Sequence, residues 1–242
     1  MPIKYQPGKK QIAWIKAGLF AAALIPLARL VWLGIHDDLT ANPIEFVERS
    51  LGTWALAILM ITLSMTPIKL LTGMVWQIQL RRMMGLFMFL YACLHFLTYI
   101  WLDQSFDWMA IVKDIAKHPY VLVGFSAFVL AIPLAVTSNN AMVRRLRERW
   151  KQLHQLVYLI AILGVVHFWW LVKKDIREPL FYALVLAVLL GIRLYYKYSK
   201  KLSDTPGATA KEALIKSKNS RFPPPARGRG LVQRWLPDIF KL

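Results

Sequence analysis

Residues 83–102 read MMGLFMFLYACLHFLTYIWL, a run of 20 residues without Lys, Arg, Asp or Glu. At about 1.5 Å of rise per residue, such a run forms a helix that can cross a hydrocarbon core of roughly 30 Å. Five more nearly uncharged runs occur along the chain, at 12–33, 51–68, 120–137, 153–172 and 179–196. The sequence therefore predicts an all-α integral membrane protein, built as a six-helix transmembrane bundle.

The distribution of basic residues predicts how this bundle is oriented. Of the 31 Lys and Arg residues, 23 fall in segments that would share one side of the membrane, namely 1–11, 69–82, 138–151 and the part from residue 193 onward. Because positively charged loops stay in the cytoplasm, both termini are expected there. The net charge of +18 then indicates contact with anionic membrane lipid rather than a nucleic-acid partner. We expect a multi-pass protein of a bacterial-type inner membrane.

The expected organisation has three parts. Residues 1–11 form a cytoplasmic N-terminus, 12–198 the six-helix domain, and 199–242 a basic cytoplasmic tail whose polar, Pro-rich composition is typical of disorder. The first apolar run is too long for the apolar region of a cleavable signal peptide, so we expect it to stay as a helix. No internal sequence repeat is evident.

Prolines predict two helix boundaries. Since proline cannot continue a helix, the second helix is expected to end at Thr66-Pro67. Proline suits a helix start, so His118-Pro119 is expected to open the fourth helix. Between the third and fourth helices, 103–119 is expected to be a loop at the outer interface.

Three of the five histidines, His95, His154 and His167, lie inside apolar runs. Ionisable side chains at membrane depth are costly and usually functional. His95 follows Arg82 by 13 residues and His167 follows His154 by 13, so His95 and His167 should reach the same depth on helices that run in the same direction. Two neutral imidazoles so placed can bind one haem iron from opposite faces, which suits electron transfer.

A second haem is less well supported by the sequence. His154 has no histidine partner at its depth, where Arg81 and Arg82 stand instead. Its open roles are ligation of another haem with an unusual partner, binding of a flavin or quinone carbonyl, or an interfacial cap. Because Cys93 is the only cysteine, the chain has no CxxCH attachment motif, and any haem would be bound non-covalently.

Other charged and polar residues have two readings each. Arg29, near the outer end of the first helix, either snorkels to the interface or pairs with a haem propionate. The basic segment 144–151, which follows the candidate helix cap Ser138-Asn139-Asn140, either meets anionic lipid or docks a flavin phosphate or an acidic partner. His36 and His118 are expected to be exposed interfacial histidines.

Several motifs together resemble the MsrQ family (formerly YedZ) of haem-binding membrane subunits, over roughly residues 10–200. The motifs are Arg81-Arg82-Met83-Met84-Gly85-Leu86, Tyr91 to Tyr99 around His95, Thr137-Ser138, Ala141-Met142, Trp150, Leu153-His154, Val157-Tyr158 and His167. This family is in turn similar to a reduced form of the ferric reductase-like transmembrane domain family.

The resemblance implies a haem b protein, with one haem and a second left open, and also flavin mononucleotide (FMN). It implies electrons from the quinone pool or a cytoplasmic flavin reductase, delivered to MsrP, a periplasmic molybdopterin enzyme that performs the methionine-sulfoxide chemistry. His95 and His167 match the family's haem-associated histidines, and His154 matches its third important one. Larger relatives carry two histidines on each of two helices; here Arg81 or Arg82 takes the place of one.

Three functions remain in competition at the level of sequence. The first is the electron-transfer subunit just described, for which catalysis belongs to the partner. The second is a stand-alone transmembrane metal or quinone reductase, which would turn over without a periplasmic protein. The third is a non-redox membrane protein with structural histidines, which would be colourless when purified.

Overall fold

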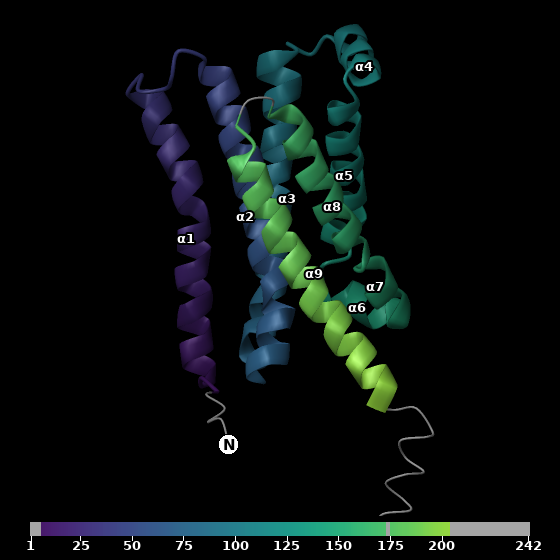
Figure 1. Ribbon diagram of the computed structural model, residues 1–242. Coiled ribbons are helices and arrows are strands. Elements are labelled where there is room, and N and C mark those ends of the chain that lie inside the picture. Colours follow the sequence, from purple (N-terminus) through teal and green to yellow (C-terminus); the bar gives the residue numbers. More distant parts are fainter. Residues whose placement is uncertain (1–5, 173–174, 204–242) are drawn as a thin grey trace, which may run out of the picture. The chain divides into compact units, whose positions relative to one another are not determined.

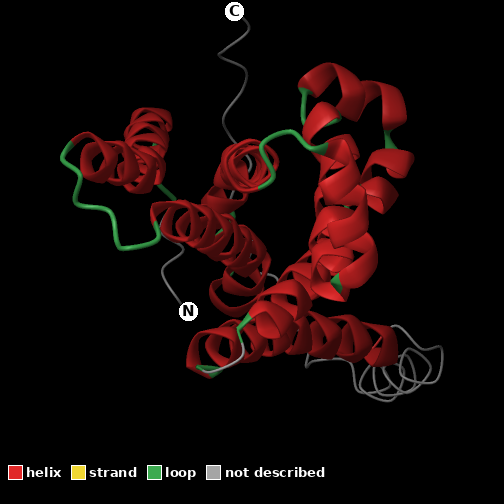
Figure 2. Ribbon diagram, turned by 90° about the horizontal axis from the view of Figure 1, so that it is seen from above, coloured by secondary structure: helices red, strands yellow, loops and turns green. Residues whose placement is uncertain are grey.

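The computed structural model describes residues 6–172 and 175–203, and within these ranges every regular element is helical (Figures 1 and 2). The elements are α1 (Lys9–Ile35), α2 (Pro43–Thr72), the 3-10 turn η1 (Trp76–Leu80), α3 (Arg81–Thr98), the π turn η2 (Tyr99–Asp103), α4 (Trp108–Lys117), α5 (Pro119–Val136), α6 (Asn140–Leu146), α7 (Glu148–Leu153), α8 (Leu156–Leu171) and α9 (Arg177–Ser203). Six helical spans in this part of the chain are long and apolar enough to cross a membrane. The predicted six-helix fold is confirmed.

Residues up to Tyr195 belong to one compact unit. A second unit begins at Tyr196, and of it the structure describes only the last turns of α9, to Ser203. The predicted cytoplasmic tail 199–242 therefore lies almost wholly outside the described residues.

Two helix pairs, α2 with α3 and α5 with α8, form the centre of the first unit (Figure 1). The two helices within each pair pack against each other more extensively than any other two elements do. Leu59 of α2, Tyr91 of α3 and Ala161 of α8 are among the side chains buried in the core of this unit. Large apolar side chains also cover the outer faces, for example Phe20 and Ile25 of α1. A helical bundle that is apolar both in its core and on its outer surface is expected of a protein embedded in a lipid membrane.

Helix α2 does not end at Pro67, so the predicted boundary is wrong. It continues to Thr72, with Gly73 in the left-handed conformation as its C-cap. Pro67 has no N–H to donate to the carbonyl of Leu63, four residues earlier. The guanidinium Nη2 of Arg193, on α9, donates to that carbonyl at 2.6 Å, so a distant side chain replaces the missing backbone bond.

Because Arg193 takes the place of the missing N–H of Pro67, the effects of mutating these two residues should depend on each other. Arg193→Met should lower the free energy of unfolding in detergent by roughly 1–3 kcal/mol, because a buried carbonyl loses a charged donor. In a Pro67→Ala background the loss should be smaller, since the alanine N–H can bond to Leu63. Equal losses in both backgrounds, measured by reversible unfolding, would instead assign the effect to the bond from Arg193 to Tyr158.

The remaining boundaries were partly predicted. Pro119 opens α5 as expected. The segment 103–119 is not only a loop, because α4 forms there after its cap Asp107, whose carboxylate accepts from the backbone N–H of Met109 at 2.9 Å. The fifth span is interrupted at His154, between α7 and α8.

Candidate functional site

His95 of α3 and His167 of α8 lie opposite each other inside the bundle. Their ring centres are 6.3 Å apart and their planes cross at 73°. Both rings line a cavity of about 750 Å³ that is lined mainly by α2, α3, α5 and α8. The two histidines expected at the same depth are therefore neighbours in space.

Both imidazoles are held by backbone carbonyls of the adjacent helix. Nδ1 of His95 donates to the carbonyl oxygen of Glu48 at 2.9 Å, and Nδ1 of His167 donates to that of Tyr120 at 2.7 Å. A carbonyl only accepts, so each Nδ1 carries the proton and each Nε2 keeps its lone pair. This is the tautomer of a metal-binding histidine whose other nitrogen is fixed by a second group.

A glycine makes room for each ring. A Cβ at Gly124 of α5 would lie 2.7 Å from Nδ1 of His167, so close that the ring would have to shift, and a Cβ at Gly52 of α2 would lie 3.2 Å from Cε1 of His95. Each glycine follows the accepting carbonyl by four residues, one helical turn. The absence of a side chain at these positions lets the imidazoles reach the backbone.

The histidine, the accepting carbonyl and the glycine have the same spacing along the chain in both arrangements. Histidine and accepting residue are 47 residues apart in both cases. Glycine and histidine are 43 apart in both, and the two sets are offset by 72 residues. The same offset pairs Arg82 with His154. The glycines and this structural repeat were missed in the sequence, although the equal His–Gly spacing was there to be found.

The geometry fits an iron held between the two rings. A metal–imidazole nitrogen bond of about 2 Å, with about 1.15 Å more from that nitrogen to the ring centre, places two rings on one iron about 6.3 Å apart. The observed separation has this value. The cavity volume also lies in the range of cofactor sites. The residues present therefore fit a haem that His95 and His167 would hold.

One end of the cavity is rich in carboxylates. The acidic residues that line it are Glu45, Glu48, Asp103, Asp114 and Asp175, and Arg49 is the basic residue in the same lining. The hydroxyl of Tyr99 donates to Asp114 at 2.8 Å. Sequence reasoning placed Asp103 and Asp114 at an interface but did not connect them to the histidine cavity.

Three other predicted residues lie elsewhere. His154 Nε2 is 3.1 Å from Oγ1 of Thr137, with the ring of Trp150 stacked on it at 3.9 Å between centres. Arg81 donates to the hydroxyl of Thr66 at 3.1 Å. Arg82 donates to the side-chain oxygen of Asn140. None of the three is among the residues that line the cavity of His95 and His167.

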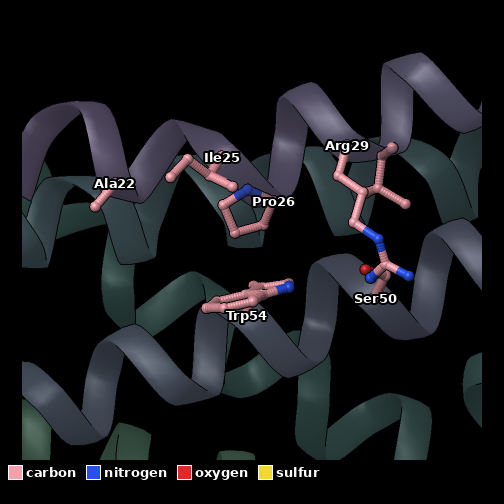
Figure 3. A pocket seen from close by; sticks show the side chains of 7 residues that line it. Ala22, Ile25, Pro26, Arg29, Ser50 and Trp54 are labelled. Atoms are coloured by element: carbon pink, nitrogen blue, oxygen red, sulfur yellow. The ribbon is translucent and has the colours of Figure 1, made fainter.

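Arg29 also lies outside that cavity. It belongs to a separate, smaller cavity between α1 and α2 (Figure 3). His118, in contrast, stands at an exposed helix start, where Nδ1 lies 2.7 Å from a carboxylate oxygen of Asp114. His36 lies at the C-terminal end of α1, with Nδ1 2.9 Å from the carbonyl oxygen of Trp32.

The fold and the two facing, pre-oriented histidines define a helical membrane protein with a candidate haem-binding cavity. Residues 51–165, from α2 into α8, match the family model described as "Ferric reductase like transmembrane component". The chain is 48% identical over 200 residues to a protein of Herminiimonas arsenicoxydans, covering 81% of this chain and 92% of that one. It is 51% identical over 190 residues to a protein of Ralstonia nicotianae, covering 77% and 88%.

Both relatives are named "Protein-methionine-sulfoxide reductase heme-binding subunit MsrQ". The chain belongs to the MsrQ family, as its motifs indicated. It is accordingly a multi-pass protein of the bacterial inner membrane. No solved structure matches it at a significant level.

Proposed function

We propose that this chain is a haem b-binding electron-transfer subunit of a methionine-sulfoxide reductase system, with His95 and His167 as the two axial ligands. The observation that carries the proposal is the pair of facing imidazoles, 6.3 Å apart, each with Nδ1 bonded to a backbone carbonyl. The names of the relatives support haem as the ligand.

The site's own residues account for electron transfer without bond-making. Bound haem b supplies a reversible one-electron iron couple. The carbonyls of Glu48 and Tyr120 hold the imidazoles in one tautomer and make their Nε2 atoms stronger ligands for a metal. Because His95 and His167 would both bind the iron, the site would leave no place for oxygen or a small substrate to coordinate. Chemistry on a sulfoxide then belongs to the partner.

A single haem is the simplest reading of the site. Nε2 of His154 is within hydrogen-bonding distance of the Thr137 hydroxyl. The 72-residue repeat pairs His154 with Arg82, whereas a second pair of haem-binding histidines would need a histidine at that position. We therefore assign His154, Arg81 and Arg82 to the cytoplasmic end of the path, where electrons enter. FMN is implied by family resemblance, and we assign no residues to it.

The direction of transfer follows from the expected topology. With both termini in the cytoplasm, α3 and α8 run outward, so the carboxylate-rich end of the cavity faces the periplasm. Electrons from the quinone pool or a cytoplasmic flavin reductase would leave there to an MsrP-type molybdopterin reductase. This path supports repair of oxidised periplasmic proteins.

The first test is a visible absorption spectrum of the purified protein, oxidised and dithionite-reduced, with a pyridine haemochrome count. We expect sharp reduced bands of a six-coordinate b-type cytochrome and one haem per chain. A colourless protein after haem-replete expression would refute the proposal and favour structural histidines. Turnover with ferric or quinone acceptors in the absence of a periplasmic protein would favour a stand-alone reductase.

A further inference from the structure

A second cavity, of about 220 Å³, lies between α1 and α2 and contains an unpaired cation. Its lining residues are Ala22, Ile25, Pro26, Arg29, Leu30, Ser50 and Trp54. Figure 3 shows the Arg29 side chain reaching from α1 toward Ser50 of α2, while the Trp54 ring lies below Pro26, about one turn further along α2. A guanidinium, a hydroxyl and an indole N–H thus line one small cavity, from two helices.

None of these three groups has a partner within the described residues. Arg29 forms no ion pair there, and the side chains of Arg29, Ser50 and Trp54 make no hydrogen bond. A guanidinium stays charged, and a charge at membrane depth is costly unless it is neutralised. The cavity therefore calls for an anion that accepts hydrogen bonds.

The depth of Arg29 suits the phosphate layer of the membrane. Helix α1 has 27 residues and is about 40 Å long, so each end extends about 5 Å beyond a core of roughly 30 Å. Arg29 precedes the end of α1, Ile35, by six residues, or about 9 Å. Its Cα is thus a few ångströms inside the hydrocarbon, and its long side chain can reach the headgroups.

We propose that this cavity binds the phosphate of an anionic phospholipid, such as phosphatidylglycerol. The phosphodiester offers only acceptors, and its charge neutralises Arg29. The Ser50 hydroxyl, toward which Arg29 points, supplies a further donor. The apolar surface of Ala22 and Ile25, one to two turns closer to the midplane, suits the start of an acyl chain, and Ile25 is 63% exposed.

Such a lipid would also fasten α1 to the bundle. Helix α1 packs sparsely against α2 and α3, far less than α2 packs against α3. A phosphate bonded to Arg29 on one helix and to Ser50 on the other would bridge this interface. Lipid binding in this cavity does not depend on haem binding, because the two cavities have different lining residues.

Native mass spectrometry of the full chain, released from nanodiscs of phosphatidylglycerol and phosphatidylcholine, tests the site. The wild type should retain phosphatidylglycerol in preference to phosphatidylcholine. Arg29→Gln should weaken that retention roughly tenfold or more, since a charged hydrogen-bonded pair is lost. Lys16→Gln, which removes the same charge from the same helix outside the cavity, is the matched control.

Ser50→Ala keeps Arg29 and should weaken retention to a smaller degree, which gives a second reading if Arg29→Gln fails to insert. Equal retention by Arg29→Gln and Lys16→Gln would overturn the proposal. A wild type without preference for the anionic lipid would overturn it too. Displacement of the lipid by a ubiquinone analogue would reassign the cavity to a neutral headgroup.

Discussion

Replacement of His95 or His167 by alanine is expected to lower the haem content per chain roughly tenfold or more. Under the proposed ligation, removing one imidazole would delete a bond to the iron, and loss of groups that merely orient a metal ligand already costs about 10–100-fold in affinity. The cavity remains, so both variants should still insert into the membrane. The measurement is a pyridine haemochrome assay, normalised to the amount of purified chain.

Two histidines outside the cavity serve as controls for this experiment. His36 and His118 lie at helix ends near the surface and do not line the cavity. Their alanine variants should retain full haem content. If both His95→Ala and His167→Ala bound haem at the wild-type level, the axial assignment would be wrong. Loss of haem in all four variants would indicate a general failure of folding.

The spans could be predicted because membrane insertion depends on local composition. A run such as 83–102 is apolar whatever it packs against, and the helices found there and in the five other runs confirm this. The end of α2 could not be predicted in the same way. Helix continuation past Pro67 depends on Arg193, which is 130 residues from the carbonyl it serves. No local signal carries that information.

The histidine pair was predictable from depth, whereas its surroundings were not. Counting residues from a basic helix start gives a position along the axis, which is sufficient to bring His95 and His167 to one level. Which glycine faces which ring depends on how the helices are rotated about their axes. Glycine is common in membrane helices for many reasons, so only the equal spacing of 43 residues from His95 and His167 could have singled out Gly52 and Gly124.

The second large effect is expected at Gly124. In Gly124→Ala, the added methyl group would lie 2.7 Å from Nδ1 and 2.8 Å from Cε1 of His167. The imidazole must move away, and its hydrogen bond to the carbonyl of Tyr120 is lost or stretched. We expect haem affinity to fall about 10–100-fold, the range found when an orienting partner of a metal ligand is removed. The haem that remains should show five-coordinate, high-spin character.

Gly52→Ala offers a graded comparison at the other ligand. There the added Cβ lies 3.2 Å from Cε1 of His95, so a shift of a few tenths of an ångström is sufficient. We expect this variant to keep most of its haem, with a smaller change in the spin-state bands. Haem binding would then tolerate alanine better at Gly52, where the added Cβ has the longer contact distance, than at Gly124.

Gly164→Ala is the matched control for both variants. Gly164 lines the same cavity and lies on the same helix as His167, but its added Cβ would make only an ordinary contact, 3.5 Å from the side chain of Leu56. If Gly124→Ala and Gly164→Ala lost haem to the same extent, reduced cavity volume would explain the loss. A larger loss and a high-spin spectrum confined to Gly124→Ala would show that the position of the His167 ring is what the glycine protects.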